Sequence, residues 1–159
     1  MADIDPFLVP ISERYFEDYL PGLVAEYGSI TLTEPEIIEF ARCFDPQYIH
    51  TDSERAAAGP YGGLIASGWH TSAVMMRLYV DHFLSQVATL GGPGCDELRW
   101  PAPVRPGDAL RLRATVVEAR VTKSRPDRGI IRVLTELRNT DDVLVFSATA
   151  VNFLRVRHA

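Results

Sequence analysis

An apolar segment from Trp69 to Val87 sets the strongest constraint on the fold of this chain. Its apolar residues recur at alternating spacings of four and three, which places them along one stripe of an α-helix; they are Trp69, Ala73, Met76, Val80, Phe83 and Val87. Further apolar residues occupy the other faces of the first turns, where Arg77 and Asp81 are the charged interruptions. A helix that is apolar nearly all round is enclosed by the rest of its fold. We therefore expect a long central helix with this stripe buried.

Two small residues stand immediately before this helix. Ser67 is a favourable N-cap, and Gly68 lets other groups approach the backbone closely. The first N–H groups of a helix have no partner within the helix and carry the positive end of its dipole. An anionic or polarised oxygen would be stabilised at this point, although the same residues also suit an ordinary helix cap.

The rest of the chain has the patterns of one strand and one helix before this segment and of several strands after it. A strand is expected at 23–32, and a helix opens where Thr33 and Glu36 form a capping box with Pro35 in the first turn. After the long helix, alternation of apolar and polar residues predicts strands at 95–100, 110–116, 131–135 and 143–156. This order predicts an α+β fold, with an antiparallel sheet of about five strands around a central helix.

Length and composition favour a single domain over residues 1–159, because 47% hydrophobic and 23% charged residues are typical of a globular protein of this size. The first 20 residues contain acidic side chains and no long apolar run, so we expect no secretory signal, no membrane span and a cytoplasmic protein. Cys43 and Cys95 are too few for a disulfide framework or a zinc site. His50 and Asp52 have no third ligand at a matching spacing, so no metal site is predicted.

The segment that follows the first helix holds the clearest candidates for chemistry, Asp45 and His50. Pro46 disfavours helical conformation at Asp45, so the first helix should stop there and the chain should continue extended or turned. A neutral imidazole takes a proton from water near pH 7, and a carboxyl group of raised pKa can return one. The pair therefore suits an acid–base addition; alternatively, Asp45 caps a turn and His50 packs against a neighbour.

Three motifs give the chain a resemblance to a known family; they are Asp45-x-Gln47-x-Ile49-His50, the run from Gly62 to Trp69, and the turn from Pro103 to Asp108. Over residues 32–153 the chain resembles the MaoC-like dehydratases, which include the R-specific enoyl-coenzyme A hydratases. The resemblance implies the hot-dog fold, in which an antiparallel sheet wraps round one long helix. It also implies hydration of a trans-2-enoyl thioester, or dehydration of its 3-hydroxy counterpart, with coenzyme A as part of the substrate and no separate cofactor.

The same resemblance assigns roles to particular residues. Asp45 and His50 would be the catalytic pair, and Gly68, preceded by its cap Ser67, would offer its backbone N–H to the thioester oxygen. Gln47 stands where many members have Asn, and it would position the attacking water or His50.

One departure from the family pattern is Tyr48, which stands where the usual motif has Pro and therefore loosens the restraint on His50 and adds bulk. The candidates for shaping the acyl pocket are Tyr48, Tyr61 and Trp69. They could narrow it for short or branched acyl groups, or stack on aromatic ones. The sequence does not choose among these acyl groups, nor between coenzyme A and carrier-protein thioesters.

Charge is unevenly distributed along the chain. The net charge of −5 argues against nucleic-acid binding. Residues 1–98 hold four arginines and fifteen acidic residues, whereas residues 99–132 hold nine basic residues and three acidic ones. Arginines of this second segment, Arg99 and Arg105 among them, could bind the phosphates of coenzyme A bidentately, or could be the solvent face of the strands.

Three functions remain in competition. The first is a hydro-lyase acting on a coenzyme A thioester. The second is a hot-dog thioesterase, which commonly needs a carboxylate on or just before the central helix, where this chain has only the distant Asp81. The third is a non-catalytic module that binds acyl thioesters. For all three we expect a homodimer or a higher homo-oligomer, because one small unit leaves a sheet edge and part of the helix uncovered.

Overall fold

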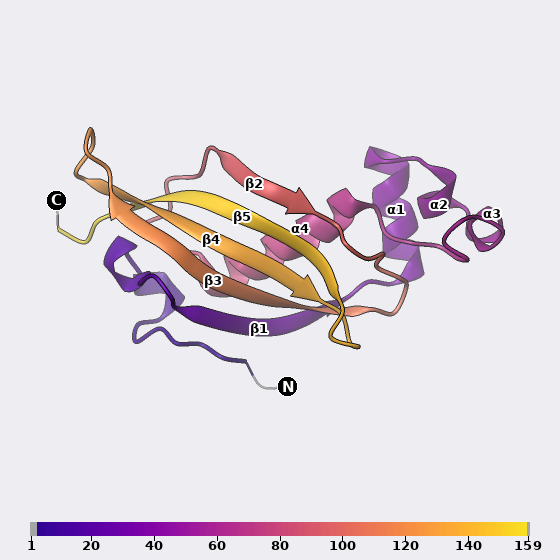
Figure 1. Ribbon diagram of the computed structural model, residues 1–159, viewed down its shortest axis with the longest axis horizontal. Coiled ribbons are helices and arrows are strands. Elements are labelled where there is room, and N and C mark those ends of the chain that lie inside the picture. The colour runs from indigo at the N-terminus through magenta and orange to yellow at the C-terminus, as the bar shows by residue number, and fades with distance from the viewer. Residues whose placement is uncertain (1–2, 159) are drawn as a thin grey trace.

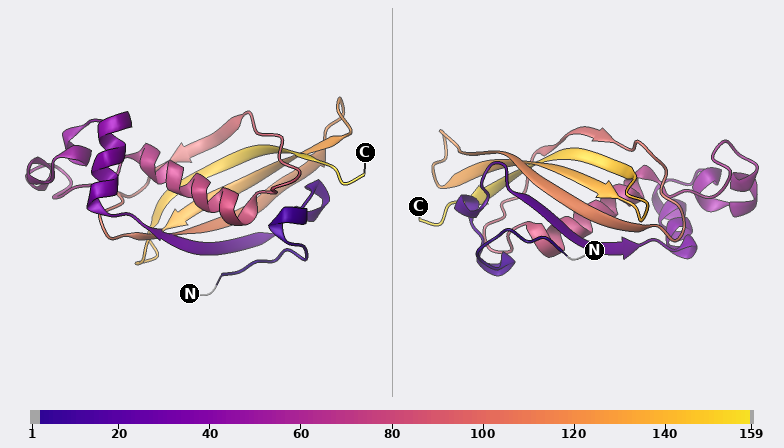
Figure 2. Two further views of the ribbon diagram at one scale, coloured as in Figure 1. Left: turned by 180° about the vertical axis from the view of Figure 1, so that it is seen from behind. Right: turned by 60° about the horizontal axis from the view of Figure 1, so that its bottom comes forward.

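The computed structural model describes residues 3–158. A curved antiparallel sheet of five strands in the order β1-β3-β4-β5-β2 lies across one long helix, α4 (Gly68–Leu78), as Figures 1 and 2 show. Its strands are β1 (Val24–Thr31), β2 (Gly94–Arg99), β3 (Ala109–Val121), β4 (Arg128–Arg138) and β5 (Leu144–Arg155). This arrangement confirms the predicted α+β class. None of the helices formed by residues 3–158 has the length and apolar character needed to cross a membrane.

The short helices between β1 and α4 lie beyond one end of the sheet (Figure 1). They are α1 (Glu34–Phe44), α2 (Tyr48–Thr51) and α3 (Ser53–Ala57). The predicted capping box of α1 is confirmed, because the Thr33 side chain accepts from the Glu36 N–H while the Glu36 carboxylate accepts from the Thr33 N–H at 2.8 Å. The chain was expected to stay extended or turned after Pro46. It instead forms the helical turn α2, because Pro46 constrains only its own φ and the residue before it.

The central helix buries a different face from the one predicted. Residues of the predicted stripe are exposed, including Trp69 (58%), Met76 (47%) and Val80 (45%), and of that stripe only Phe83 is fully buried. The sheet instead covers the face that carries Val74, Met75 and Leu78. Both faces are apolar, so periodicity alone could not decide which one the sheet would cover. The result is an uncovered apolar stripe along the outer side of α4.

The sheet follows its predicted period of two. In β3, Leu110, Leu112 and Ala114 are fully buried, while the arginines between them are partly or fully exposed. Successive side chains on a strand point to opposite faces, so the apolar set lies against α4 and the arginines face solvent. The core is therefore one layer between the helix and the inner face of the sheet.

The N-terminal segment closes the far end of the central helix, where a π-helical turn, η3 (Tyr79–Phe83), follows α4. Two 3₁₀ turns, η1 (Ile11–Glu13) and η2 (Phe16–Asp18), lie in this segment. Arg14 is 2% exposed, and its guanidinium donates to the carbonyl oxygens of His82 and Phe83 at 2.8 and 3.3 Å. A cation at a helix C-terminus is favoured by the helix dipole and satisfies carbonyls that have no partner in the helix.

Candidate active site

Three helix ends bring the predicted catalytic residues together. Asp45 is the C-cap of α1, His50 lies in α2, and Ser67 is the N-cap of α4. The nearer carboxylate oxygen of Asp45, Oδ2, lies 3.5 Å from His50 Nε2 and accepts a hydrogen bond from Ser67 Oγ at 2.7 Å. The other oxygen, Oδ1, accepts from Gln47 Nε2 at 2.8 Å. Asp45 therefore forms hydrogen bonds with Gln47 and Ser67 and lies beside His50.

The surroundings of His50 fix which of its ring nitrogens is free. His50 is 5% exposed, and its Nδ1 lies 2.8 Å from the carbonyl oxygen of Ile65. A carbonyl only accepts hydrogen bonds, so Nδ1 carries the proton of the neutral ring. Nε2 then presents a lone pair beside the Asp45 carboxylate, where it can take a proton from a water molecule.

The Asp45 carboxylate is stabilised in its ionised form. The hydrogen bond from the Gln47 side chain lowers the pKa of Asp45 most, followed by the bond from the Ser67 hydroxyl, and together they outweigh the opposing effect of burial. A charged acceptor gains more from such donors than a protonated acid does. Asp45 is thus a carboxylate at neutral pH, and the carboxyl group of raised pKa that the sequence suggested is not found.

Substitution of Ser67 by Ala raises the pKa of Asp45 toward its ordinary value, because the carboxylate loses a donor that its protonated form does not need. The measurement is an NMR titration of the Asp45 side-chain carboxyl carbon. Ser72→Ala is the matched control, since the Ser72 hydroxyl donates to the Gly68 carbonyl and not to Asp45. An equal shift in both variants would contradict this assignment.

The pair opens into a hollow of about 590 Å³ at the N-terminus of α4. Tyr61, Gly68 and Trp69, which the sequence offered as site residues, line it, and so do Trp100 and Val145, which the sequence did not single out. Gly68 is in the first turn of α4, and its N–H donates to no other group within residues 3–158, whereas the Trp69 N–H is taken by Ser67 Oγ. The hollow therefore brings together a carboxylate, an imidazole and a backbone donor that has no partner among residues 3–158.

Tyr48 does not lie where the sequence analysis placed it. The residues that line the hollow include its neighbours Gln47 and Ile49 but not Tyr48. The helical turn α2 directs the Tyr48 ring outward, where the Arg55 guanidinium stacks on it at 4.7 Å. Tyr in place of the usual Pro therefore adds no bulk to the hollow.

Arg99 and Arg105 differ from the other arginines of the basic segment. Within residues 3–158 neither forms an ion pair, whereas the other six all pair with a carboxylate; these are Arg111, Arg113, Arg120, Arg125, Arg128 and Arg132. Arg105 borders the hollow, since it donates to the carbonyl of Tyr61 at 2.6 Å. Arg99 is the residue before Trp100 at the end of β2. Because neither has a carboxylate partner among residues 3–158, both guanidinium groups can pair with an anionic ligand.

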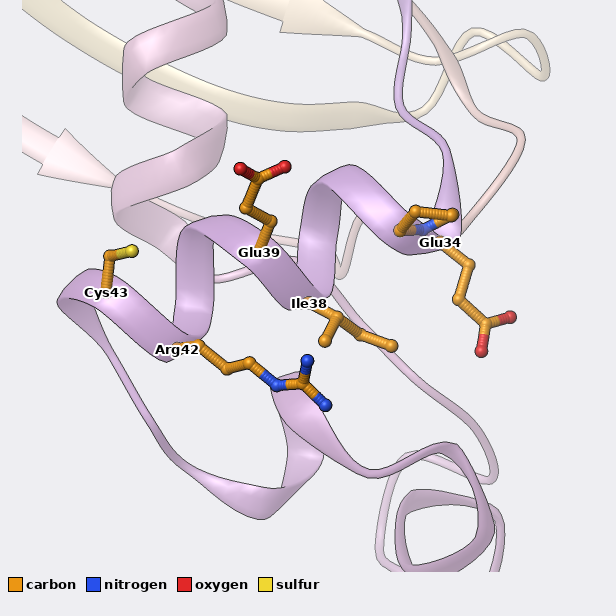
Figure 3. A pocket seen from close by; sticks show the side chains of 6 residues that line it. Glu34, Ile38, Glu39, Arg42 and Cys43 are labelled. Atoms are coloured by element: carbon orange, nitrogen blue, oxygen red, sulfur yellow. The ribbon is translucent and has the colours of Figure 1, made fainter.

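A larger depression lies along the outer face of α1 (Figure 3). It is lined by Glu34, Pro35, Ile38, Glu39, Arg42 and Cys43. Figure 3 shows these side chains spread along one helix rather than directed at a common point. No acid–base pair or cluster of donors is formed there by the residues shown, so the hollow at Asp45 and His50 is the candidate active site.

Comparison with known proteins places these residues in a family. The sequence matches the MaoC like domain over residues 21–137. It is 33% identical to the uncharacterised protein YdeM of Bacillus subtilis, over 82% of this chain and 91% of that one. It is 39% identical to the 3-hydroxyacyl-thioester dehydratase Z of Mycobacterium tuberculosis, a match that covers 59% of this chain and 64% of that protein.

The fold is also that of solved structures. A crystal structure of a MaoC-like dehydratase from Rhodospirillum rubrum superposes with a TM-score of 0.83 at 36% identity, covering 92% of this chain and 99% of that one. The structural neighbours have the hot-dog fold, which confirms the predicted architecture.

Proposed function

The chain belongs to the MaoC-like domain family, and from this premise we propose that it is a hydro-lyase acting on acyl thioesters. It would add water to a trans-2-enoyl coenzyme A thioester, or remove water from the 3-hydroxyacyl counterpart, without a separate cofactor. The observation that supports this most is the His50 Nε2 placed 3.5 Å from the Asp45 carboxylate in a hollow that also presents the Gly68 N–H.

The proposed hydration needs a base, a proton donor and a group that stabilises negative charge. His50 Nε2 takes a proton from water as the water oxygen attacks the β-carbon. The proton passes over the 3.5 Å gap to Asp45, which delivers it to the α-carbon. The Gly68 N–H, at the positive end of the α4 dipole, stabilises the enolate oxygen that forms in between. Dehydration runs through the same steps in reverse.

The structure offers less support for hydrolysis of the thioester. Asp81, the one carboxylate on the central helix segment, pairs with Arg77 at 2.6 Å on an exposed face. It is not among the residues that line the hollow. Asp45 is the remaining carboxylate near the helix start, and its hydrogen bonds and its contact with His50 suit proton transfer.

Spectrophotometry of a short trans-2-enoyl coenzyme A tests the proposal against both alternatives. Loss of the conjugated absorbance without release of free thiol is the expected result. Release of thiol at a comparable rate would instead identify a thioesterase. Binding of the thioester with neither change would identify a non-catalytic module.

We expect Arg105 to bind a coenzyme A phosphate. Arg105→Ala should raise KM for an enoyl coenzyme A by up to about fivefold, because an exposed charge pair is worth ~0.2–1 kcal/mol, and should change kcat little. Added salt should reduce the difference between the two proteins. The pantetheine thioester, which lacks the distal phosphates, should give the same KM for both. An equal loss with pantetheine would show that Arg105 acts through Tyr61 instead. Arg120→Ala is the matched control, since Arg120 already pairs with Glu118.

We also expect the protein to be a homodimer. The exposed apolar stripe carries Trp69 and Met76 on α4 and Val80 on η3, and β2 pairs with β5 on one side only. A second copy would cover both features, as closed symmetric pairs do. Light scattering should give twice the chain mass at micromolar concentration, and Met76→Asp should shift the mass toward the monomer. Leu8→Asp, at a fully exposed position of the N-terminal segment, should have no effect. A stable wild-type monomer would contradict the expectation.

A further inference from the structure

A second hollow lies next to the catalytic one and is almost entirely apolar. Its volume is about 310 Å³, and its lining comes from α4, β2 and β5, with Met75, Leu98, Phe146 and Ala148 among its residues. Trp69 lines both hollows. On β5, Val145 belongs to the catalytic hollow and Phe146 to the apolar one. The apolar hollow therefore extends further along α4, to Met75 and Met76, whereas the catalytic hollow reaches Thr71.

The indole of Trp100 is held at the boundary between the two hollows. It lines the catalytic hollow, while its Nε1 donates at 3.3 Å to Ser72 Oγ, which belongs to the apolar hollow. Its fused ring is pressed against Gly68, where an added Cβ would lie 2.6 Å from two of the ring carbons. Trp69 meets it edge to face at 5.3 Å. A hydrogen bond and two packing contacts thus fix its position.

The position of Trp100 limits where an acyl chain can extend. A thioester whose oxygen is bound by the Gly68 N–H has its phosphates on one side and its alkyl chain on the other. Tyr61, whose carbonyl accepts from Arg105, lines the catalytic hollow but not the apolar one, whereas Trp69 lines both. An alkyl chain directed toward the apolar hollow meets the Trp100 indole before it reaches Met75 and Phe146.

We propose that Trp100 is the residue that determines acyl-chain length, by closing the catalytic hollow and separating it from the apolar one. The wild-type protein then favours short acyl groups of about four carbons. The apolar hollow becomes an extension of the acyl site when the indole is removed. This inference rests on the proposed action on acyl thioesters, and it names the part of the substrate that the site selects.

The first test measures kcat/KM for trans-2-enoyl coenzyme A thioesters of four to ten carbons. Each methylene that enters an apolar site contributes about fourfold in affinity. Trp100→Ala should therefore raise the ratio of eight-carbon to four-carbon activity at least roughly tenfold, and Trp100→Phe should raise it less. In the Trp100→Ala background, Cys95→Phe should lower the ratio again, because Cys95 lines the apolar hollow and a larger side chain fills it. An unchanged ratio in Trp100→Ala would overturn the proposal.

The second test does not depend on turnover. Calorimetric titration with butyryl and octanoyl coenzyme A, which have no double bond to hydrate, gives the affinity ratio directly. Wild-type protein should favour the butyryl thioester, and Trp100→Ala should shift the ratio toward octanoyl. A shift in the affinity ratio in a protein that shows no hydration would support the role of Trp100 and would contradict the proposed hydro-lyase activity. Equal ratios in both proteins would overturn the role of Trp100, whatever the activity.

Discussion

Replacement of Asp45 by Asn lowers the turnover of enoyl-thioester hydration by about 10²–10⁴-fold, the contribution typical of one acid–base group. The amide preserves the shape of the side chain but cannot carry the proton between His50 Nε2 and the α-carbon. Binding should persist, because the proposed role of Asp45 is at the reacting atoms and not at the phosphates. The effect is measured as loss of the enoyl absorbance in stopped-flow or steady-state assays. Asp52→Asn, at the N-cap of α3, is the matched control.

His50→Ala should lower turnover to a similar extent, and the double variant should lose little more than either single one. Groups that work as a unit show this non-additivity. Near wild-type hydration activity in Asp45→Asn would contradict the catalytic assignment and would show that Asp45 serves only as a helix C-cap. Losses that multiply in the double variant would mean that the two residues act in separate steps.

The second large effect is expected from Gly68→Ala. An added Cβ would lie 2.6 Å from the Trp100 ring, closer than side chains pack, so the indole or the start of α4 must move. The Gly68 N–H then leaves its position for the thioester oxygen. We expect a loss of about 10²–10³-fold in kcat on the four-carbon substrate, the size found when one oxyanion donor is removed.

The double variant Gly68→Ala/Trp100→Ala tests whether the steric clash between the added Cβ and the Trp100 indole causes the loss of activity. It should recover most of the activity, because the indole that meets the Cβ is absent. Ala is a better helix former than Gly, so the single variant should not lose helix stability for intrinsic reasons. If the double variant stays as inactive as Gly68→Ala, the effect comes from the Gly68 backbone itself and not from Trp100.

The features that the sequence could predict are mostly those formed by residues close together along the chain. The group formed by Asp45, Gln47 and His50 lies within six residues, and the cap at Ser67 starts an unmistakable helix, so both could be recognised before their contact was known. The strands were predicted from alternation within each strand. These features depend on neighbours along the chain, which the sequence displays directly.

Features that depend on distant contacts were missed. Trp100 reaches Gly68 only because β2 lies beside β5 at the sheet edge, and nothing in its own neighbourhood indicates this. Tyr48 was placed in the pocket because the turn α2, which points it outward, was not foreseen. The buried face of α4 was wrong for a related reason, since two apolar faces compete and only the sheet decides between them.

The helices that carry Asp45 and His50 extend beyond the end of the sheet. The local stability of the candidate active site can therefore differ from the stability of the sheet. Regions with few partners in the core open locally at a lower free energy than the core itself. Opening of α1 to α3 would part Asp45 from Ser67 while every strand remained paired. Inactivation by heat or denaturant can then precede melting of the sheet. Substitutions that raise the melting temperature by strengthening the strands would leave the lifetime of the active site unchanged.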